Sequence, residues 1–270
     1  MRADQFLHVN NYAESRQKAQ TLIKSGSVEI DGVKIVKPSV EIFDGIPHKV
    51  ILTNDEKYVG RGGLKLEGAL QAFGIKPDGL ICADIGASTG GFTDCLLQKG
   101  ASKVYAFDSG RDQLHKKLLA DPRVISKEGF NARYIDPDDV SEMVDLVVMD
   151  VSFISQTMII PALVSIIKDG GTLVSLVKPQ FEAGRAALGK NGIVKNAKDR
   201  YLAAIRVLDC AREAGLSCRG FVRSPIKGGD GNEEYLIYLI KSPDPMGDTE
   251  WREKIKAITT KTEKEVKSRP

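Results

Sequence analysis

The sequence predicts a Rossmann-like α/β domain, with a doubly wound parallel sheet, that follows a small α+β domain. Three observations support this fold class. Short apolar strands alternate with helices from residue 64 to residue 240, and polar residues stand at the carboxyl ends of several strands. A glycine-rich turn follows the first of these strands. Because ligands of such sheets bind at the carboxyl ends of the strands, the pattern also predicts a ligand site there.

Residues 1–57 are predicted to form the small α+β domain. Apolar residues with helical spacing indicate two helices, and Ser15 is placed to cap the second. Alternating residues on both sides of Asp31-Gly32 predict a β-hairpin. Residues 49–52 are expected to add a third strand.

The glycine-rich segment 58–63 is predicted to be a linker to the second domain, residues 64–243. Residues 244–270 form a charged tail, poor in large apolar side chains, which we expect to be helical. In the second domain the expected strands are 80–84, 103–107, 144–149, 173–177 and 235–240, and the expected helices are 64–73, 92–98 and 201–214.

The composition of the chain restricts its function. The 270 residues carry 39 Lys and Arg against 36 Asp and Glu, and this net charge of +3 permits nucleic-acid binding without arguing for it. The four cysteines and three histidines are scattered, so we expect no metal site, and reduced thiols in the cytoplasm. No signal peptide and no apolar run long enough to span a membrane is apparent.

The most informative motif runs from Asp84 to Asp94, between an apolar strand and a helix, where backbone N–H groups can hold a ligand. It lacks the Gly-Lys-Ser/Thr of a P-loop and the spacing of the dinucleotide motif. An acidic residue before the turn would repel a pyrophosphate but suits a ligand with an ammonium group and no phosphate. S-adenosylmethionine fits this description. Asp108, after the next strand, is placed to accept hydrogen bonds from a ribose diol.

A turn that binds no ligand is the alternative interpretation of this motif, and the presence of both Asp84 and Asp108 argues against it. The predicted cofactor-binding residues are Asp84, Gly86, Ala87, Ser88, Thr89, Gly90, Gly91, Phe92, Asp108 and Asn131.

Four more polar residues form a candidate catalytic group: Lys65, Asp150, Lys178 and Glu234. We expect them to converge on the ligand crevice. An alcohol that attacks a methyl sulfonium must lose its proton, and two lysines with two carboxylates are suited to accept it and to orient the acceptor. Lys65 taken alone would be interpreted as a surface lysine, and Glu233 stays an alternative to Glu234.

Five motifs between residues 58 and 240 resemble those of one family. They are Gly60-Arg61-Gly62-Gly63-Leu64-Lys65-Leu66, Asp84 to Asp94, Val148-Met149-Asp150-Val151-Ser152-Phe153-Ile154-Ser155, Val177-Lys178-Pro179-Gln180-Phe181-Glu182 and Gly231-Asn232-Glu233-Glu234-Tyr235. The chain resembles the TlyA family, whose catalytic domain is of the FtsJ-like rRNA methyltransferase type. The family's Lys-Asp-Lys-Glu tetrad maps onto the four residues above. The resemblance implies methylation of a cytidine 2′-hydroxyl in ribosomal RNA, with S-adenosylmethionine as the cofactor.

Residues 15–32 resemble the alpha-L RNA-binding motif of a small-subunit ribosomal protein and of pseudouridine synthases. Three cations on a helix are usually a solvated face, but this resemblance implies a surface that binds folded RNA. The implied partner is ribosomal RNA or a ribosomal subunit, bound by a monomer or weak dimer. The ends of the chain favour the large subunit and leave both rRNAs open. The predicted RNA-binding residues are Arg2, Arg16, Lys18, Lys24 and Arg61.

Three alternative functions stay open. Relatives of the family often carry the label haemolysin, but membrane damage requires a spanning helix, a barrel hairpin or a strongly amphipathic helix, and only the tail is a candidate. A catalytically silent RNA-binding assembly factor would not need all four tetrad positions. Base methylation usually uses a cysteine nucleophile or an Asn/Asp-Pro-Pro-Tyr-like loop, and neither follows Asp150.

Overall fold

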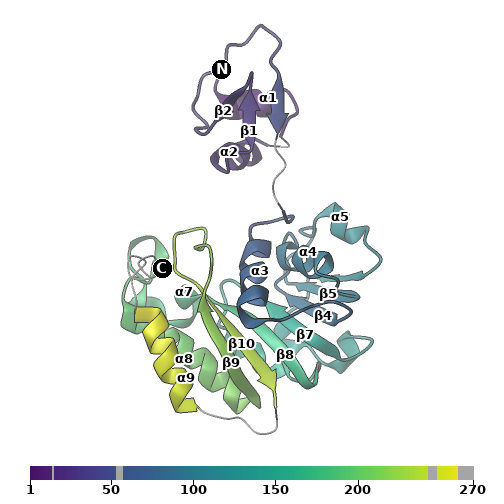
Figure 1. Cartoon of the computed structure of the whole chain (residues 1–270), viewed down its shortest axis with the longest axis vertical. Helices are drawn as coiled ribbons and strands as arrows, with labels where there is room; N and C mark the ends of the chain where they lie inside the picture. The colour runs from purple at the N-terminus through teal and green to yellow at the C-terminus, as the bar shows by residue number, and fades with distance from the viewer. Residues whose placement is uncertain (14, 53–56, 243–247, 261–270) are drawn as a thin grey trace. The chain divides into compact units, whose positions relative to one another are not determined.

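The computed structural model describes residues 1–13, 15–52, 57–242 and 248–260. The chain divides into two compact units, Met1–Glu56 and Lys57–Pro270 (Figure 1). Residues 53–56 of the polar stretch and residues 244–247 and 261–270 of the predicted tail lie outside the described residues.

The N-terminal unit consists of two helices and a three-stranded antiparallel sheet with the order β2-β1-β3. Ser15 Oγ accepts a hydrogen bond from the backbone N–H of Lys18, which confirms the predicted helix cap. Asp31 and Gly32 have φ values of 52° and 80°, as the predicted hairpin turn requires. The elements are α1 (Ala3–Val9), α2 (Arg16–Lys24), β1 (Val28–Ile30), β2 (Val33–Ile35) and β3 (Val50–Leu52).

The second unit is built on a seven-stranded sheet with the order β6-β5-β4-β7-β8-β10-β9. All five expected strands are present. Strand β6 escapes sequence analysis because it lies at the edge of the sheet and is half-buried along its whole length, so no apolar run marks it. The elements are α3 (Gly62–Phe73), β4 (Ile81–Ile85), α4 (Gly91–Gln98), β5 (Lys103–Asp108), α5 (Lys116–Leu119), β6 (Val124–Glu128), β7 (Val144–Met149), α6 (Ile160–Leu163), β8 (Ile167–Val177), α7 (Pro179–Glu182), α8 (Ala197–Glu213), β9 (Leu216–Arg223), β10 (Tyr235–Lys241) and α9 (Asp248–Thr260).

The sheet is mixed, which corrects the prediction of a parallel sheet. Strands β6, β5, β4, β7 and β8 run parallel, whereas β10 runs antiparallel to both β8 and β9. Strand β10 follows β9 through a loop rather than a crossover helix, and such a connection reverses the strand direction. The start of β10 therefore lies at the edge where β7 and β8 end, with Tyr235 opposite Val177.

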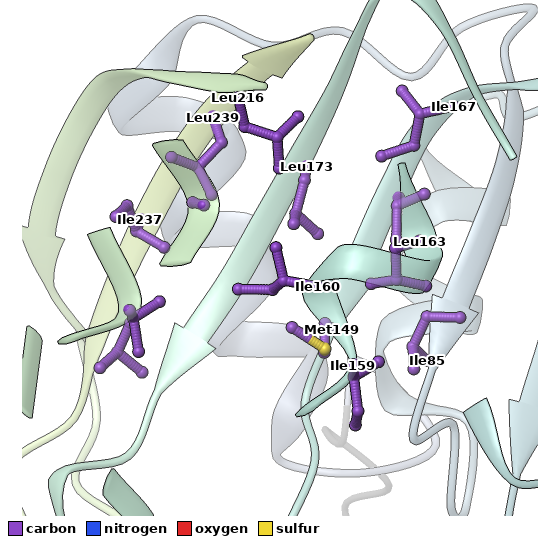
Figure 2. Packing of buried hydrophobic residues seen from close by; sticks show 14 of the residues in the cluster. Ile85, Met149, Ile159, Ile160, Leu163, Ile167, Leu173, Leu216, Ile237 and Leu239 are labelled. Carbon is purple, nitrogen blue, oxygen red and sulfur yellow. The ribbon is translucent and has the colours of Figure 1, made fainter. Parts of the chain in front are cut away.

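Two hydrophobic cores cover the two faces of this sheet. Side chains alternate between the faces along each strand, so Met149 belongs to the first core and Val148 to the second. Helices α6, α8 and α9 cover the first face, and α3 and α4 cover the second. Figure 2 shows the first core, where Ile160 and Leu163 of α6 pack with Leu173 of β8. The sheet is thus a rigid central layer whose carboxyl edge carries the loops described below.

The structure differs from two expected boundaries. The expected linker 58–63 packs into the second unit, since Tyr58 is 2% exposed and α3 already begins at Gly62. The helix expected in the tail is α9, and its Ile255 is fully buried in the first core, so this part of the tail belongs to the fold. Among the helices that the structure describes, none is long and apolar enough to cross a membrane.

Candidate active site

A cavity of about 670 Å³ opens at the carboxyl ends of β4, β5 and β7. It is lined by the turn after β4, the end of β5, the segment after β6 and the loop after β7. This is the crevice where such a sheet binds its ligand. The predicted residues that line it are Gly86, Ser88, Asp108, Asn131 and Asp150.

The turn after β4 requires glycine at position 86. Gly86 has a φ of +83°, and a Cβ there would lie 2.6 Å from the backbone oxygen of Asp150. The backbone N–H groups of Gly86 and Ala87 donate to Phe107 O, at 2.9 and 3.0 Å. The turn is therefore held between β5 and β7 with its backbone next to the cavity.

Asp108 ends β5 and accepts two backbone hydrogen bonds. Its Oδ2 accepts from Ser88 N and its Oδ1 from Gly110 N, both at 2.7 Å. Each carboxylate oxygen can accept from a second donor, such as a ribose hydroxyl. Asn131 lines the same cavity and caps a short 3₁₀ turn, because its Oδ1 accepts from Arg133 N at 3.2 Å.

Asp84 does not line the cavity, which corrects the prediction that it contacts the cofactor. Its side chain is fully buried in β4, and its Oδ2 accepts a hydrogen bond from Thr93 Oγ1 at 2.7 Å. Burial raises the pKa of Asp84 to about 7, and the charges of Asp150 and Asp108 add to this effect. Within the described part of the chain, its Oδ1 has no hydrogen-bond partner.

The rest of the predicted cofactor set does not line the cavity: Thr89 is exposed, and Gly90 packs behind the turn. Gly90 has a φ of +95°, and a Cβ there would clash with Leu118. This close packing explains why glycine occupies position 90. Besides Asp84, the predicted cofactor-binding residues outside the cavity lining are Ala87, Thr89, Gly90, Gly91 and Phe92.

The four predicted catalytic residues form two ion pairs. Lys178 Nζ lies 2.5 Å from Asp150 Oδ1 and donates a 2.8 Å hydrogen bond to Ser152 Oγ. Lys65 Nζ donates a 2.6 Å hydrogen bond to Glu234 Oε2. The four side chains are between 3% and 20% exposed, so solvent screens these charges less than at the surface. Each lysine thus has its own carboxylate partner.

The structure distinguishes Glu234 from its neighbour Glu233. Glu233 lies 3.2 Å from Arg223 Nη1 and 3.6 Å from Arg200 Nε. Glu234 faces Lys65 instead, because successive side chains at the start of a strand point to opposite faces. The geometry therefore favours Glu234 as the fourth member of the group.

The glycines at the start of α3 bring Lys65 to this site. A Cβ on Gly62 would lie 3.8 Å from Asp150 Oδ2, and a Cβ on Gly91 would lie 3.0 Å from Gly63 N. Helix α3 thus begins against both the turn after β4 and the loop after β7. Lys65, in its first turn, is consequently only 9% exposed and is not the surface lysine that its helix alone would suggest.

Ser152 and Phe153 line the cavity close after Asp150, and neither is among the predicted site residues. Phe153 is 93% exposed. Its backbone φ is +63°, an uncommon conformation for a bulky residue. Its ring centroid lies 5.2 Å from that of Phe181. A large aromatic side chain three residues after a predicted catalytic aspartate was the available signal, although the sequence alone does not show that it is exposed.

The predicted RNA-binding residues are exposed on their own units. Arg2 Nε lies 3.0 Å and Arg16 Nη2 3.1 Å from the carboxylate of Asp4, which is fully buried. Arg2 in particular holds the pKa of Asp4 well below its usual range. Lys18 is two positions from Arg16 in α2, so the two side chains point to different sides of the helix. The exposed cations are Arg2, Arg16, Lys18 and Lys24 in the N-terminal unit and Arg61 in the second unit.

The features of the second unit occur together in one class of enzyme. They are a glycine turn after β4, an aspartate at the end of β5, a cavity between them, and lysine–carboxylate pairs at the same edge of the sheet. The fold and the site define an S-adenosylmethionine-dependent methyltransferase. Across the described ranges, no three side chains of His, Cys, Asp or Glu are grouped so that they could hold a metal ion.

Known proteins share both parts of the chain. Residues 58–241 match the FtsJ-like methyltransferases and residues 1–42 match the S4 domain. The chain is 42% identical over 243 residues to the 16S/23S rRNA (cytidine-2′-O)-methyltransferase TlyA of Mycobacterium tuberculosis, which covers 90% of this chain and 91% of that protein. It is 44% identical over 245 residues to hemolysin A of Brachyspira hyodysenteriae, and the match covers 89% of this chain and 100% of that protein. A solved hemolysin structure from Streptococcus thermophilus is 42% identical, with a TM-score of 0.78, and covers 99% of this chain and 97% of that one.

The chain belongs to the TlyA family of FtsJ-like methyltransferases and carries an S4 domain in its N-terminal unit. The fold class, the enzyme class and the cofactor predicted from the sequence are confirmed. The S4 domain is an RNA-binding domain, so both units agree with an enzyme that acts on RNA.

Proposed function

We propose that the chain methylates the 2′-hydroxyl of a cytidine ribose in ribosomal RNA, with Lys178 as the proton acceptor. The observation that carries this proposal is the presence of two largely buried lysine–carboxylate pairs at the edge of the sheet where the cavity opens. Among the described residues that line the cavity, none is a histidine or a cysteine. Lys178 is not among the lining residues, but its Nζ is paired with the lining residue Asp150 and donates to the lining residue Ser152, so it is the best placed group to take the proton.

S-adenosylmethionine supplies the methyl group when it is bound. The cavity of about 670 Å³ has the size of a pocket for a ligand of this kind. Asp108 and Asn131 offer polar groups for a ribose and a base, and Gly86 lets the backbone approach closely. These residues fit the cofactor without any pyrophosphate-binding group.

The side chains at the carboxyl ends of the strands are proposed to orient the 2′-hydroxyl and to remove its proton. The 2′-hydroxyl must be held in line with the methyl group and must lose its proton. We assign the proton to Lys178 Nζ, which accepts it as a neutral amine to become an ammonium and is held by Asp150 and oriented by Ser152. The Lys65–Glu234 pair at the same end of the strands is assigned to positioning the ribose.

Substrate recognition is proposed to involve both units. The exposed ring of Phe153 beside the cavity can stack on the target base, since any base offers a π-face. The S4 domain would bind folded RNA mainly through its phosphates. The proposed target is large-subunit rRNA, modified in the cytoplasm by a monomer or weak dimer, and the proposed reaction involves no metal ion. The relative from M. tuberculosis is named for both rRNAs, so both are tested below.

The proposal is tested by Lys178→Ala and Lys178→Arg, with Lys76→Arg at an exposed lysine as the control. Both Lys178 variants should lose methyl transfer and retain S-adenosylmethionine binding. Alanine removes the amine, and arginine keeps the charge but cannot accept a proton. Ribose methylation is mapped on both rRNAs after incubation with each protein. A near-normal single-turnover rate for Lys178→Arg would make Lys178 an electrostatic clamp, and methylation of a base would overturn the proposal.

A further inference from the structure

Strands β7 and β8 stop pairing just before the catalytic residues that follow them. Their parallel register ends at Met149 opposite Ser175, one residue before Asp150 and three before Lys178. Beyond this point the two strands have no further pairing with each other. The ladder therefore does not set the separation of Asp150 and Lys178, and other contacts must hold it.

Glu182 provides the first of these contacts. It lies four residues after Lys178, at the end of α7, and is 1% exposed. Its Oε2 accepts a 2.6 Å hydrogen bond from Ser155 Oγ, and its Oε1 accepts a 2.8 Å hydrogen bond from Gln156 N. Both carboxylate oxygens thus bind the far end of the loop that begins at Asp150.

Gln156 provides the second contact and is also 1% exposed. Its Nε2 donates a 2.6 Å hydrogen bond to Leu176 O, and its Oε1 accepts a 2.8 Å hydrogen bond from Ser175 Oγ. The side-chain amide of Gln156 thus donates to the carbonyl of Leu176, which lies in β8 one residue past the end of the pairing with β7. The loop is therefore tied to β8 by a side chain where the backbone ladder has ended.

These contacts matter because α7 cannot hold its own position. A helix of four residues is unstable by itself, so its placement depends on tertiary contacts. On its other side Arg206 Nη1 donates a 2.5 Å hydrogen bond to Glu182 O, which ties α7 to α8. Burial raises the pKa of the Glu182 carboxyl, and a buried acceptor that loses its donors costs about 1–3 kcal/mol. Loop, short helix and strand are thus held as one body.

We propose that Glu182, together with Gln156, is a positioning residue that sets the separation of Asp150 and Lys178. Glu182 does not line the cavity and belongs to neither ion pair, so it acts through the loop and α7. This inference rests on the proposed function of Lys178. It assigns the buried glutamate of the Val-Lys-Pro-Gln-Phe-Glu motif to the geometry of proton transfer rather than to cofactor binding.

The test compares Glu182→Ala with Glu182→Gln in the full-length protein. Glu182→Ala should lower the single-turnover rate of ribose methylation by roughly ten- to a hundred-fold at saturating RNA and S-adenosylmethionine, as expected for a displaced catalytic group. Its affinity for S-adenosylmethionine, measured by calorimetry, should stay near that of the wild type. Glu182→Gln should recover most of the rate, because its oxygen can accept from Gln156 N and its amide can donate to Ser155 Oγ.

The matched control is Asp145→Ala, at the opposite end of β7. Asp145 accepts hydrogen bonds from Ile81 N at 2.9 Å and Lys168 Nζ at 2.6 Å, so its loss should lower the unfolding temperature without changing the rate. All rates are measured below the unfolding temperature of the least stable variant. If Glu182→Ala does not fold, Ser155→Ala, which removes one arm of the contact, should still lower the rate.

A folded Glu182→Ala or Ser155→Ala variant with the wild-type rate would overturn the inference. So would a fall in rate for Asp145→Ala that parallels its loss of stability. Lys178→Ala in the same assay separates this result from the proposed function. If Lys178→Ala is inactive while Glu182→Ala is fully active, the positioning role alone fails, whereas an active Lys178→Ala variant overturns both proposals.

Discussion

Lys65 and Glu234, 169 positions apart in the sequence, form a hydrogen-bonded ion pair of 2.6 Å whose side chains are 11% and 3% exposed. Removing charges from water is unfavourable, and the pair offsets this only while both partners are present. The pair joins the first turn of α3 to the start of β10. It therefore connects two segments that carry catalytic candidates and are not neighbours in the chain.

Glu234→Gln should destabilise the fold and slow methyl transfer. The substitution leaves the Lys65 ammonium partly buried without its counter-charge, and such losses cost about 3–5 kcal/mol in fully buried pairs. Urea unfolding should show that the double variant Lys65→Met/Glu234→Gln is more stable than the sum of the two single losses predicts. Additive losses would indicate that the two residues do not interact in solution.

Asp108→Ala should weaken the binding of S-adenosylmethionine by roughly 1.5–3 kcal/mol, the effect of losing a charged hydrogen bond. The turn also loses the acceptor of Ser88 N and Gly110 N, so part of the effect comes from a looser cavity wall. Isothermal titration measures the affinity, with Asp136→Ala at an exposed site as the control. Equal affinities in wild type and Asp108→Ala would exclude Asp108 from the site.

Phe153→Ala should raise the KM for RNA while leaving the free energy of unfolding nearly unchanged. The ring is 93% exposed, so little is buried on folding, but stacking on a base is worth about 1–3 kcal/mol. Phe153→Trp keeps a π-face and should retain activity. RNA binding by fluorescence anisotropy checks both variants, and equal affinity for Phe153→Ala and Phe153→Trp would argue against stacking.

Arg16→Ala should weaken RNA binding and flatten its dependence on salt. A lost phosphate contact reduces the slope of log K against log [salt] by about 1, because fewer counterions are released. Arg16 is held by the buried Asp4 carboxylate, so it is ordered before RNA binds. Titrations at several salt concentrations measure the slope, with Lys76→Ala as the exposed control. An unchanged slope would remove Arg16 from the RNA-binding surface.

Asp84→Asn should change the dependence of stability on pH. Burial raises the pKa of Asp84 to about 7, so the folded state holds its proton between roughly pH 4 and 7 while the unfolded state has lost it. The free energy of unfolding of the wild type therefore falls as the pH rises through this window. Above the window, Asp84 causes no further change. Asparagine does not titrate in this range. The free energy of unfolding of Asp84→Asn relative to that of the wild type should therefore rise by roughly 2–4 kcal/mol from pH 4 to 7. Thermal unfolding at several pH values checks this, and a constant difference would contradict it.

Much of the site was predictable because local patterns mark the ends of buried strands. The turn after β4 and the positions of Asp108, Asp150 and Lys178 follow from apolar runs that stop at polar residues. Asp84 shows the limit of such reasoning. Its place before a glycine turn suggested contact with the cofactor, but the direction of a side chain from a strand depends on the pleat, and Asp84 turns into the protein.

By itself, the sequence determined that this chain has two domains of these classes, a glycine turn for a phosphate-free nucleoside and four polar candidates, because periodicity and glycine are local properties of the chain. Only the tertiary structure decided how the candidates pair. Strand β10 runs antiparallel, so the start of this strand, and with it Glu234, reaches the edge where Lys178 follows β8. Strand direction and register depend on contacts between segments that are distant in the sequence. For the same reason, only the fold shows that Lys65 is buried against Glu234 and that Phe153 is exposed.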